Sequence, residues 1–112
     1  MSYVPPAYVY VIGEPGSGLV KIGRSNAPNR RLTEIRCAAK MRSAVVLWSI
    51  DVSDKAQAHG VEQLAHSLLR SRRVHRRREW FRVTPELAQQ AIERAIHLGV
   101  PGNLPQYGEP IS

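Results

Sequence analysis

A tyrosine and a lysine near the start of the chain lie on two segments that are typical of paired strands. Residues 8–13 (YVYVIG) contain Tyr10 and residues 19–23 (LVKIG) contain Lys21, with the turn formers of residues 13–18 (GEPGSG) between them. A hairpin symmetric about the centre of that turn places Tyr10 directly opposite Lys21, with their Cβ atoms roughly 5 Å apart. The pair is either a cross-strand contact on the less apolar face of the sheet or a phenol whose proton the ammonium makes easier to lose.

Three side chains that can bind a metal ion share one face of a later helical segment. His59, Glu62 and His66 stand at positions i, i+3 and i+7, which groups them on one side of a helix. A lone glutamate in such a position is commonly a solvated surface residue. The group of three also suggests a site for a borderline metal such as zinc, but its spacing lacks the two histidines four residues apart of the H-E-x-x-H motif.

Basic residues dominate the charge of the chain and crowd into one stretch. The formal net charge is +7 and the pI is about 10.3. This balance favours a polyanionic partner such as a nucleic acid, because each cation that neutralises a phosphate releases a counterion. One arginine-rich stretch forms either a solvated basic loop or a clamp for a nucleic-acid backbone. It contains Arg70, Arg72, Arg73, Arg76, Arg77 and Arg78.

The elements expected around these residues follow the order ββαβα(β)α. The continuous apolar run of residues 44–52 predicts a central, well-covered strand, and residues 79–83 (EWFRV) predict a short one. We therefore expect an α/β (α+β) fold with a small three-stranded antiparallel sheet flanked by helices. One domain is expected over residues 1–99, followed by a Pro-rich C-terminal tail over residues 100–112.

Capping residues and apolar periodicity predict three helices. The first begins at Pro28, the second follows an N-cap at Asp54, and the third follows the cap Thr84 and ends at Gly99. Strand alternation in the EWF segment sends only one of its two aromatic side chains into the core. The expected apolar faces contain Leu32, Ile35 and Ala39 in the first helix, Val61, Leu64, Ala65 and Leu68 in the second, and Ala88, Ala91, Ile92 and Ala95 in the third.

Composition argues against several other classes of protein. Cys37 is the single cysteine, so a disulfide within the chain and a cysteine-based zinc cage are excluded. The first residues lack the layout of a signal peptide, and no apolar run is long enough to span a bilayer. A cytoplasmic protein is the expectation.

The hairpin and the elements after it carry short motifs in a distinctive order. Residues 8–10 (YVY), followed by residues 21–23 (KIG), resemble the paired GIY and YIG strands of the GIY-YIG nuclease superfamily. The loop and arginine-bearing helix after Arg24 resemble the next segment of that family. With KIG in place of YIG, the E-x-x-x-H pattern of Glu62 and His66, and EWF at residues 79–81, the chain looks most like the bacteriophage-associated branch.

The resemblance implies a GIY-YIG-like nuclease domain, a DNA endonuclease that hydrolyses phosphodiester bonds with one divalent ion, Mg²⁺ or Mn²⁺. Glu62 would hold the ion, Tyr10 would activate or orient the attacking water, and Arg31 would stabilise the charge that grows on the phosphate. The residues expected to bind the nucleic acid are Arg24, Arg30, Arg72, Arg73, Arg76, Arg77 and Arg78.

Two positions depart from the family pattern. Lys21 stands where the second motif tyrosine is usual, and Ile35 stands where many active members have a tyrosine or histidine. Lys21 and His66 are expected to compensate as catalytic residues. The alternative is a catalytically impaired DNA-binding module with the same fold. DNA is the expected partner in both cases, and sequence specificity is expected to need a homodimer or a separate specificity partner.

Overall fold

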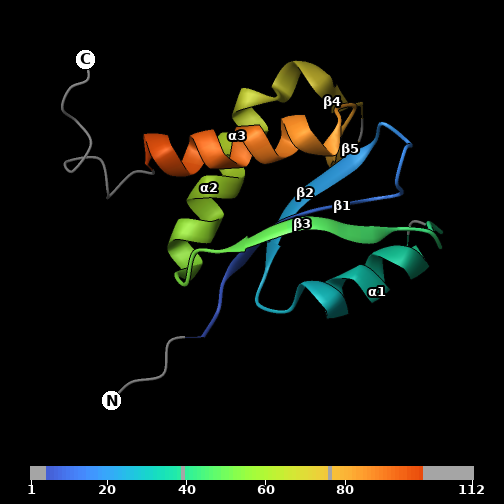
Figure 1. Ribbon diagram of the computed structural model, residues 1–112, viewed down its shortest axis with the longest axis horizontal. Coiled ribbons are helices and arrows are strands. Elements are labelled where there is room, and N and C mark those ends of the chain that lie inside the picture. The colour runs from blue at the N-terminus through green and yellow to red at the C-terminus, as the bar shows by residue number, and fades with distance from the viewer. Residues whose placement is uncertain (1–4, 39, 76, 100–112) are drawn as a thin grey trace.

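The computed structural model describes residues 5–38, 40–75 and 77–99, which form one antiparallel sheet with helices on both of its faces (Figure 1). The described strands lie in the order β3-β1-β2-β5-β4. The predicted tail, residues 100–112, lies outside the described residues. In chain order the elements are β1 (Tyr8–Gly13), β2 (Val20–Ser25), α1 (Pro28–Ala38), β3 (Val45–Asp51), α2 (Lys55–Leu68), a 3-10 turn (Arg70–Arg72), β4 (Arg73–Val74), β5 (Arg77–Phe81) and α3 (Pro85–Leu98).

The α+β class is confirmed, but the three-stranded sheet was wrong. β4 and β5 form a hairpin that extends the sheet beyond β2, where the sequence indicated a single short strand. Arginines fill much of this hairpin, so it lacks the alternation of apolar and polar residues that reveals a strand. No helix in the described ranges has the length and apolarity needed to cross a membrane.

The predicted central position of the strand in residues 44–52 was also wrong. β3 pairs only with β1 and forms one edge of the sheet. Its apolar side chains lie on both faces of the sheet: Trp48 and Ile50 pack in one core, and Val46 packs in the other. A continuous apolar run therefore reports that both faces are covered and does not report how many strands lie beside it.

The hairpin of β1 and β2 pairs in a register two residues away from the symmetric one. Tyr10 lies opposite Gly23, and Lys21 lies opposite Ile12. The backbone N–H of Ser17 donates to the carbonyl of Glu14 (3.1 Å), which closes a turn, and the next two residues remain outside the ladder. A shift of two residues keeps every side chain on its predicted face, so Tyr10 and Lys21 still share one face.

Both faces of the sheet are buried. α2 and α3 cover the face that carries Val11 and Phe81, and α1 covers the face that carries Tyr10 and Trp80 (Figure 1). The expectation that only one aromatic residue of the EWF segment is buried was therefore wrong. Alternation does send Trp80 and Phe81 to opposite faces of the sheet, but helices cover both faces, so both side chains are buried.

N-caps determine where the helices begin, and apolar faces determine which side of each helix packs on the sheet. Asp54 accepts hydrogen bonds from the backbone N–H groups of Ala56 and Gln57, and Thr84 accepts one from Leu87, so both predicted N-caps are confirmed. The described apolar residues predicted for α1 and α3 are buried as expected: Leu32, Ile35, Ala88, Ala91, Ile92 and Ala95. Ala39 lies outside the described residues.

α2 is rotated about its axis relative to its predicted buried face. Val61 and Ala65 are buried as predicted and Leu64 is partly buried, whereas Leu68 is 40% exposed. Glu62 and His66 are buried in its stead. The reason lies in β2, because β5 pairs with β2 only at Val20 and Lys21. Beyond that point the Nε2–H of His66 donates to the carbonyl of Ile22 (2.8 Å), and the histidine takes the place of a strand partner.

Replacing His66 with leucine should destabilise the protein much more than the same change at His59, an exposed histidine on the same helix. The expected cost at His66 is about 1–3 kcal/mol, because a buried backbone carbonyl loses its donor. At His59 the expected change is within about 0.5 kcal/mol. Urea unfolding of the two variants measures both values, and equal effects would show that the bond to Ile22 contributes nothing.

Candidate active site

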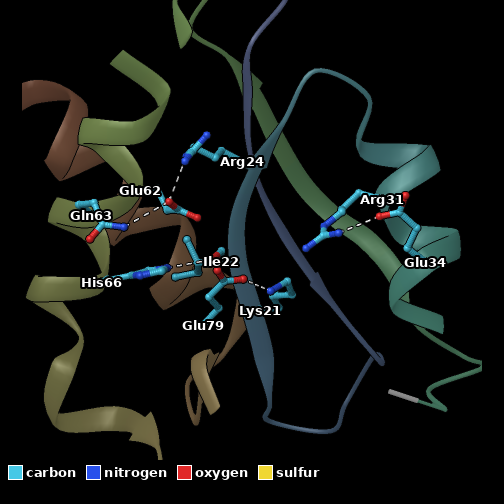
Figure 2. A network of polar contacts seen from close by, with 9 residues as sticks. All are labelled: Lys21, Ile22, Arg24, Arg31, Glu34, Glu62, Gln63, His66 and Glu79. Carbon is cyan, nitrogen blue, oxygen red and sulfur yellow. Dashed lines mark hydrogen bonds and ion pairs between the residues drawn. The ribbon is translucent and has the colours of Figure 1, made fainter. Parts of the chain in front are cut away.

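The sequence-predicted catalytic residues come from four elements that meet around β2. Tyr10 lies on β1 and Lys21 on β2, while Arg31 lies on α1 and Glu62 on α2. Figure 2 shows α1 on one side of β2 and α2 on the other, with the side chains of Arg31 and Glu62 both directed toward the strand. Arg31 thus lies on the α1 side of β2 and Glu62 on the α2 side, and β2 pairs with β5 only at Val20 and Lys21.

Tyr10 lies within the core on the α1 face, and its side chain is only 1% exposed. Its ring crosses over Gly23, the residue opposite it on β2. A Cβ atom at position 23 would lie 2.7 Å from the Cζ atom of Tyr10, a distance that no real side chain tolerates. Gly23 is therefore required for steric reasons, since it leaves room for the phenol.

The phenol of Tyr10 keeps its proton at neutral pH. Burial raises the pKa of Tyr10 above its ordinary value of 10.0, and the charges of Glu79 and Glu62 raise it further. The nearby Arg31 guanidinium opposes this shift in the pKa without cancelling it. The hypothesis that Lys21 makes the proton easier to lose thus does not hold, because Tyr10 faces Gly23 and the net shift is upward.

Arg31 connects the buried phenol to the surface. Its Nη1 donates to Oε1 of Glu34 (2.7 Å), and both side chains are about half exposed. The hydrogen bond to Glu34 and the proximity of Tyr10 raise the pKa of Arg31, so it remains a cation. An exposed ion pair of this kind contributes about 0–1 kcal/mol, so a phosphate can replace Glu34 at small cost.

Glu79 joins the site although its segment was predicted to be structural. Its carboxylate forms an ion pair with Lys21, whose side chain is buried (Figure 2). Burial raises the pKa of Glu79, but Lys21, His66 and Arg31 together outweigh burial and leave it below its ordinary value of 4.5. Strand pairing explains what was missed, because Trp80, the neighbour of Glu79, lies opposite Lys21.

Glu62 has two donors on one carboxylate oxygen. Arg24 Nε and Gln63 Nε2 both donate to its Oε1, each at 3.3 Å (Figure 2). Within the described part of the chain, no hydrogen bond involves Oε2 of Glu62. A buried carboxylate with one oxygen held and the other uncommitted can accept a cation as a ligand.

Two shallow hollows meet at Arg31. One, of about 260 Å³, is lined by Arg24, Ser25, Arg30, Arg31 and Glu34. The other, of about 200 Å³, is lined by Lys21, Arg31, Glu34, Ile35, Ala38 and Trp80. Neither lining includes Tyr10 or Glu62, because the ring of Tyr10 lies in the core and Glu62 is covered by its ion pair with Arg24. We name the first the arginine hollow, since three cations converge there.

The predicted DNA-binding arginines at the other end of the sheet lie on the surface. Arg72, Arg73 and Arg77 are exposed, and the guanidinium of Arg73 lies 5.6 Å from the ring centroid of Phe81. Arg76 and the side chain of Arg78 lie outside the described residues. The exposed groups carry positive charge along β4 and β5, beside the carboxylate of Glu79.

The zinc alternative finds no support in the geometry. His59 is exposed, while Glu62 and His66 are buried against β2. Among the described residues, no group of three histidine, cysteine, aspartate or glutamate side chains is placed to hold a metal ion. Cys37, on α1, is exposed. Any metal bound by Glu62 would therefore take its other ligands from water and substrate.

The small α+β domain carries a phenol, a guanidinium and a carboxylate around one strand pair, and the family that it matches has a GIY-YIG-like, endonuclease-type fold. The chain belongs to the T5orf172 domain family, whose model matches residues 7–96. That family is phage-associated and of nuclease or DNA-binding type. Comparisons with curated proteins and with solved structures gave no match.

The contact between Gly23 and Tyr10 should appear as a strong coupling between two substitutions. Gly23→Ala alone is expected to destabilise the protein by about 1–3 kcal/mol, because the ring must move to admit the new Cβ. In a Tyr10→Leu background the same change should cost much less, since leucine lacks the Cζ and hydroxyl atoms. Unfolding free energies of the four proteins measure the coupling, and additive effects would contradict it.

The raised pKa of Tyr10 predicts how stability depends on alkaline pH. The unfolded chain loses the tyrosine proton near pH 10, while the folded protein still holds it, so this contribution is present below about pH 10 and is lost as the pH rises further. The unfolding free energy of wild type, measured relative to that of Tyr10→Phe, should therefore fall between about pH 9 and about pH 11. Urea titrations at several pH values test this, and a difference that stays constant would contradict the shift.

Proposed function

We propose that this domain is a metal-dependent DNA endonuclease that hydrolyses phosphodiester bonds. The observation that carries the proposal is the hollow on which Arg24, Arg30 and Arg31 converge. The charges of Arg31 and Glu62 also both act on the phenol of Tyr10. Three groups suited to phosphate chemistry thus lie within electrostatic range of one another. They come from three separate elements, which surface packing alone would not bring together.

The arginine hollow is the proposed position of the backbone phosphate. Arg24, Arg30 and Arg31 line it, and each is partly or largely exposed. A guanidinium can donate two parallel hydrogen bonds to phosphate oxygens, and its charge offsets the negative charge that grows as water attacks. Arg31 is the main candidate for that role, because it lies close enough to the buried phenol of Tyr10 to interact with it.

Tyr10 acts in this proposal as a neutral hydrogen-bond donor. Its raised pKa rules out a phenolate as the resting state at neutral pH. The ring lies in the core and lines neither hollow, so the protonated hydroxyl acts on the phosphate only through Arg31. The proton of the water must then pass to another acceptor, and a phosphate oxygen or a solvent molecule is the simplest one.

Glu62 fits the binding of one Mg²⁺ or Mn²⁺ ion. Magnesium commonly binds proteins through one or two carboxylates and takes its remaining ligands from waters and substrate phosphates, so a single glutamate is sufficient. When bound, such an ion would supply positive charge to the phosphate and acidify a bound water. Oε2 of Glu62 is the oxygen that remains available for it, since both donors approach Oε1.

Lys21 and His66 are proposed to position the site. Lys21 keeps Glu79 ionised and fixed at the end of the short ladder between β2 and β5. His66 uses its Nε2–H to hold α2 against Ile22, one helical turn beyond Glu62. Lys21 lines the same hollow as Ile35 of α1, whereas His66 packs against Phe81 on the other face of the sheet. Of the two, Lys21 is therefore the side chain near the position where the family has its tyrosine or histidine.

DNA is the proposed substrate and partner. Arg24 and Arg30 would contact the backbone next to the scissile bond, and Arg72, Arg73 and Arg77 would extend those contacts along the sheet edge. Such contacts position a duplex but carry no sequence information. Specificity is therefore assigned to a homodimer or to a separate protein.

A nicking assay on supercoiled plasmid tests the proposed activity. Wild type should cut in the presence of Mg²⁺ or Mn²⁺, and Arg31→Ala should reduce the rate by about 100- to 1,000-fold because a charge-stabilising donor is lost. Glu62→Ala should also abolish the metal-dependent reaction. Arg94→Ala and Glu93→Ala make the same charge changes at exposed positions of α3 and should leave the rate unchanged.

The outcomes separate the enzyme from the binding module. Metal-dependent cutting that is lost in Arg31→Ala and Glu62→Ala alone supports the endonuclease. DNA binding that weakens steeply with salt, without any cutting by the wild type, supports the module instead. Cutting at the wild-type rate by both variants would remove Arg31 and Glu62 from the mechanism.

A further inference from the structure

Arg24 and Glu62 form an ion pair that joins the surface to a buried carboxylate. The side chain of Glu62 is 7% exposed and that of Arg24 is 38% exposed. A buried carboxylate needs a counter-charge, because an ionised group without one is strongly disfavoured in a low-dielectric interior. In the protein without a metal ion, Arg24 supplies that charge.

The contact between the two side chains is of a kind that can be exchanged. Only Nε of Arg24 reaches Oε1 of Glu62, at 3.3 Å, so the pair lacks the two parallel hydrogen bonds of the strongest arginine–carboxylate pairs. No other hydrogen bond of the Arg24 side chain occurs within the described residues. Its terminal nitrogens therefore remain available to another acceptor (Figure 2).

Arg24 already borders the proposed phosphate position. Its side chain lines the arginine hollow with Arg30 and Arg31, and it also lines a larger neighbouring hollow of about 560 Å³. A guanidinium that is partly exposed between two hollows can change partner without opening the core. The same arginine can thus contact either Glu62 or a phosphate, but its Nε cannot serve both at full strength.

We propose that Arg24 acts as an exchangeable counter-ion: it holds Glu62 in the metal-free protein and moves to a DNA phosphate when a divalent ion binds the carboxylate. The inference rests on the proposed function, since it assumes that Glu62 takes the ion and that the arginine hollow takes the phosphate. Metal and DNA then bind with positive coupling, and by linkage each ligand raises the affinity for the other. The site is complete only when both are present.

Arg30 provides a matched control. It is exposed, lines the same hollow, and contacts Asn26 Oδ1 at 3.4 Å without touching Glu62. Arg24→Ala and Arg30→Ala remove the same charge from the same hollow. General electrostatics therefore changes similarly in the two variants, and only Arg24→Ala frees the carboxylate.

The experiment measures Mn²⁺ binding by the full chain, by electron paramagnetic resonance or calorimetry, with and without a short phosphorothioate duplex that resists hydrolysis. Without DNA, Arg24→Ala should bind Mn²⁺ about 5-fold or more tightly than wild type, the lower end of typical coupling between sites. Arg30→Ala should stay within about 2-fold of wild type, as expected for an exposed charge change. DNA should tighten Mn²⁺ binding in wild type and Arg30→Ala, and this enhancement should vanish in Arg24→Ala.

Two further variants keep the result interpretable. Arg24→Lys retains a cation without the Nε contact, so it should bind Mn²⁺ more tightly than wild type even if Arg24→Ala folds poorly. Equal Mn²⁺ affinity in Arg24→Ala, Arg24→Lys and Arg30→Ala, or weaker binding in the Arg24 variants, would overturn the exchange. Glu62→Ala distinguishes a failure of the Arg24 exchange from a failure of the metal site. If Glu62→Ala leaves Mn²⁺ affinity unchanged, the metal site of the proposed function fails as well. If Glu62→Ala loses Mn²⁺ binding, that metal site is retained whatever the Arg24 variants show.

Discussion

The ladder between β2 and β5 ends after Val20 and Lys21, and the arrangement of the candidate site follows from this early end. A longer ladder would cover the edge of β2 with backbone hydrogen bonds and leave no role for a side chain there. The edge is instead met by α2, whose His66 bonds to the carbonyl of Ile22. The same rotation of the helix brings Glu62 against Arg24. One interrupted strand pairing thus turns a polar stripe of a surface helix toward the sheet.

Charged groups in this region are held in pairs, which explains how a small domain tolerates them. Lys21 pairs with Glu79 and Arg24 pairs with Glu62, and among the described residues no buried side-chain nitrogen or oxygen lacks a hydrogen-bond partner. Buried ion pairs are often no more stabilising than apolar residues of similar volume, because desolvation offsets their attraction. Their presence here is better explained by what they position than by the stability that they contribute.

Local signals were sufficient to predict the helices and much of the chemistry. Both N-caps, the apolar faces of α1 and α3, and the shared face of Tyr10 and Lys21 follow from residues close in sequence. The errors arose where distant segments decide the outcome. Leu68 is exposed because contacts with the edge of β2 set the rotation of α2 about its axis. Glu79 enters the site because its strand pairs with β2 beside Lys21. Periodicity within one segment contains no information on either pairing.

Burial distinguishes the two arginine–glutamate pairs of the site. Arg31 and Glu34 are about half exposed, so a phosphate can displace the carboxylate, which water then solvates. Glu62 has much less access to water, and removing Arg24 without another cation would leave its charge largely uncompensated. Arg31 is therefore open to any phosphate, while the Nε of Arg24 is released only when an ion replaces it at Glu62. DNA bound without the metal ion and DNA bound in a state ready for hydrolysis would then differ in whether the Nε of Arg24 contacts the phosphate. The same small surface would first bind the DNA backbone and then take part in its hydrolysis.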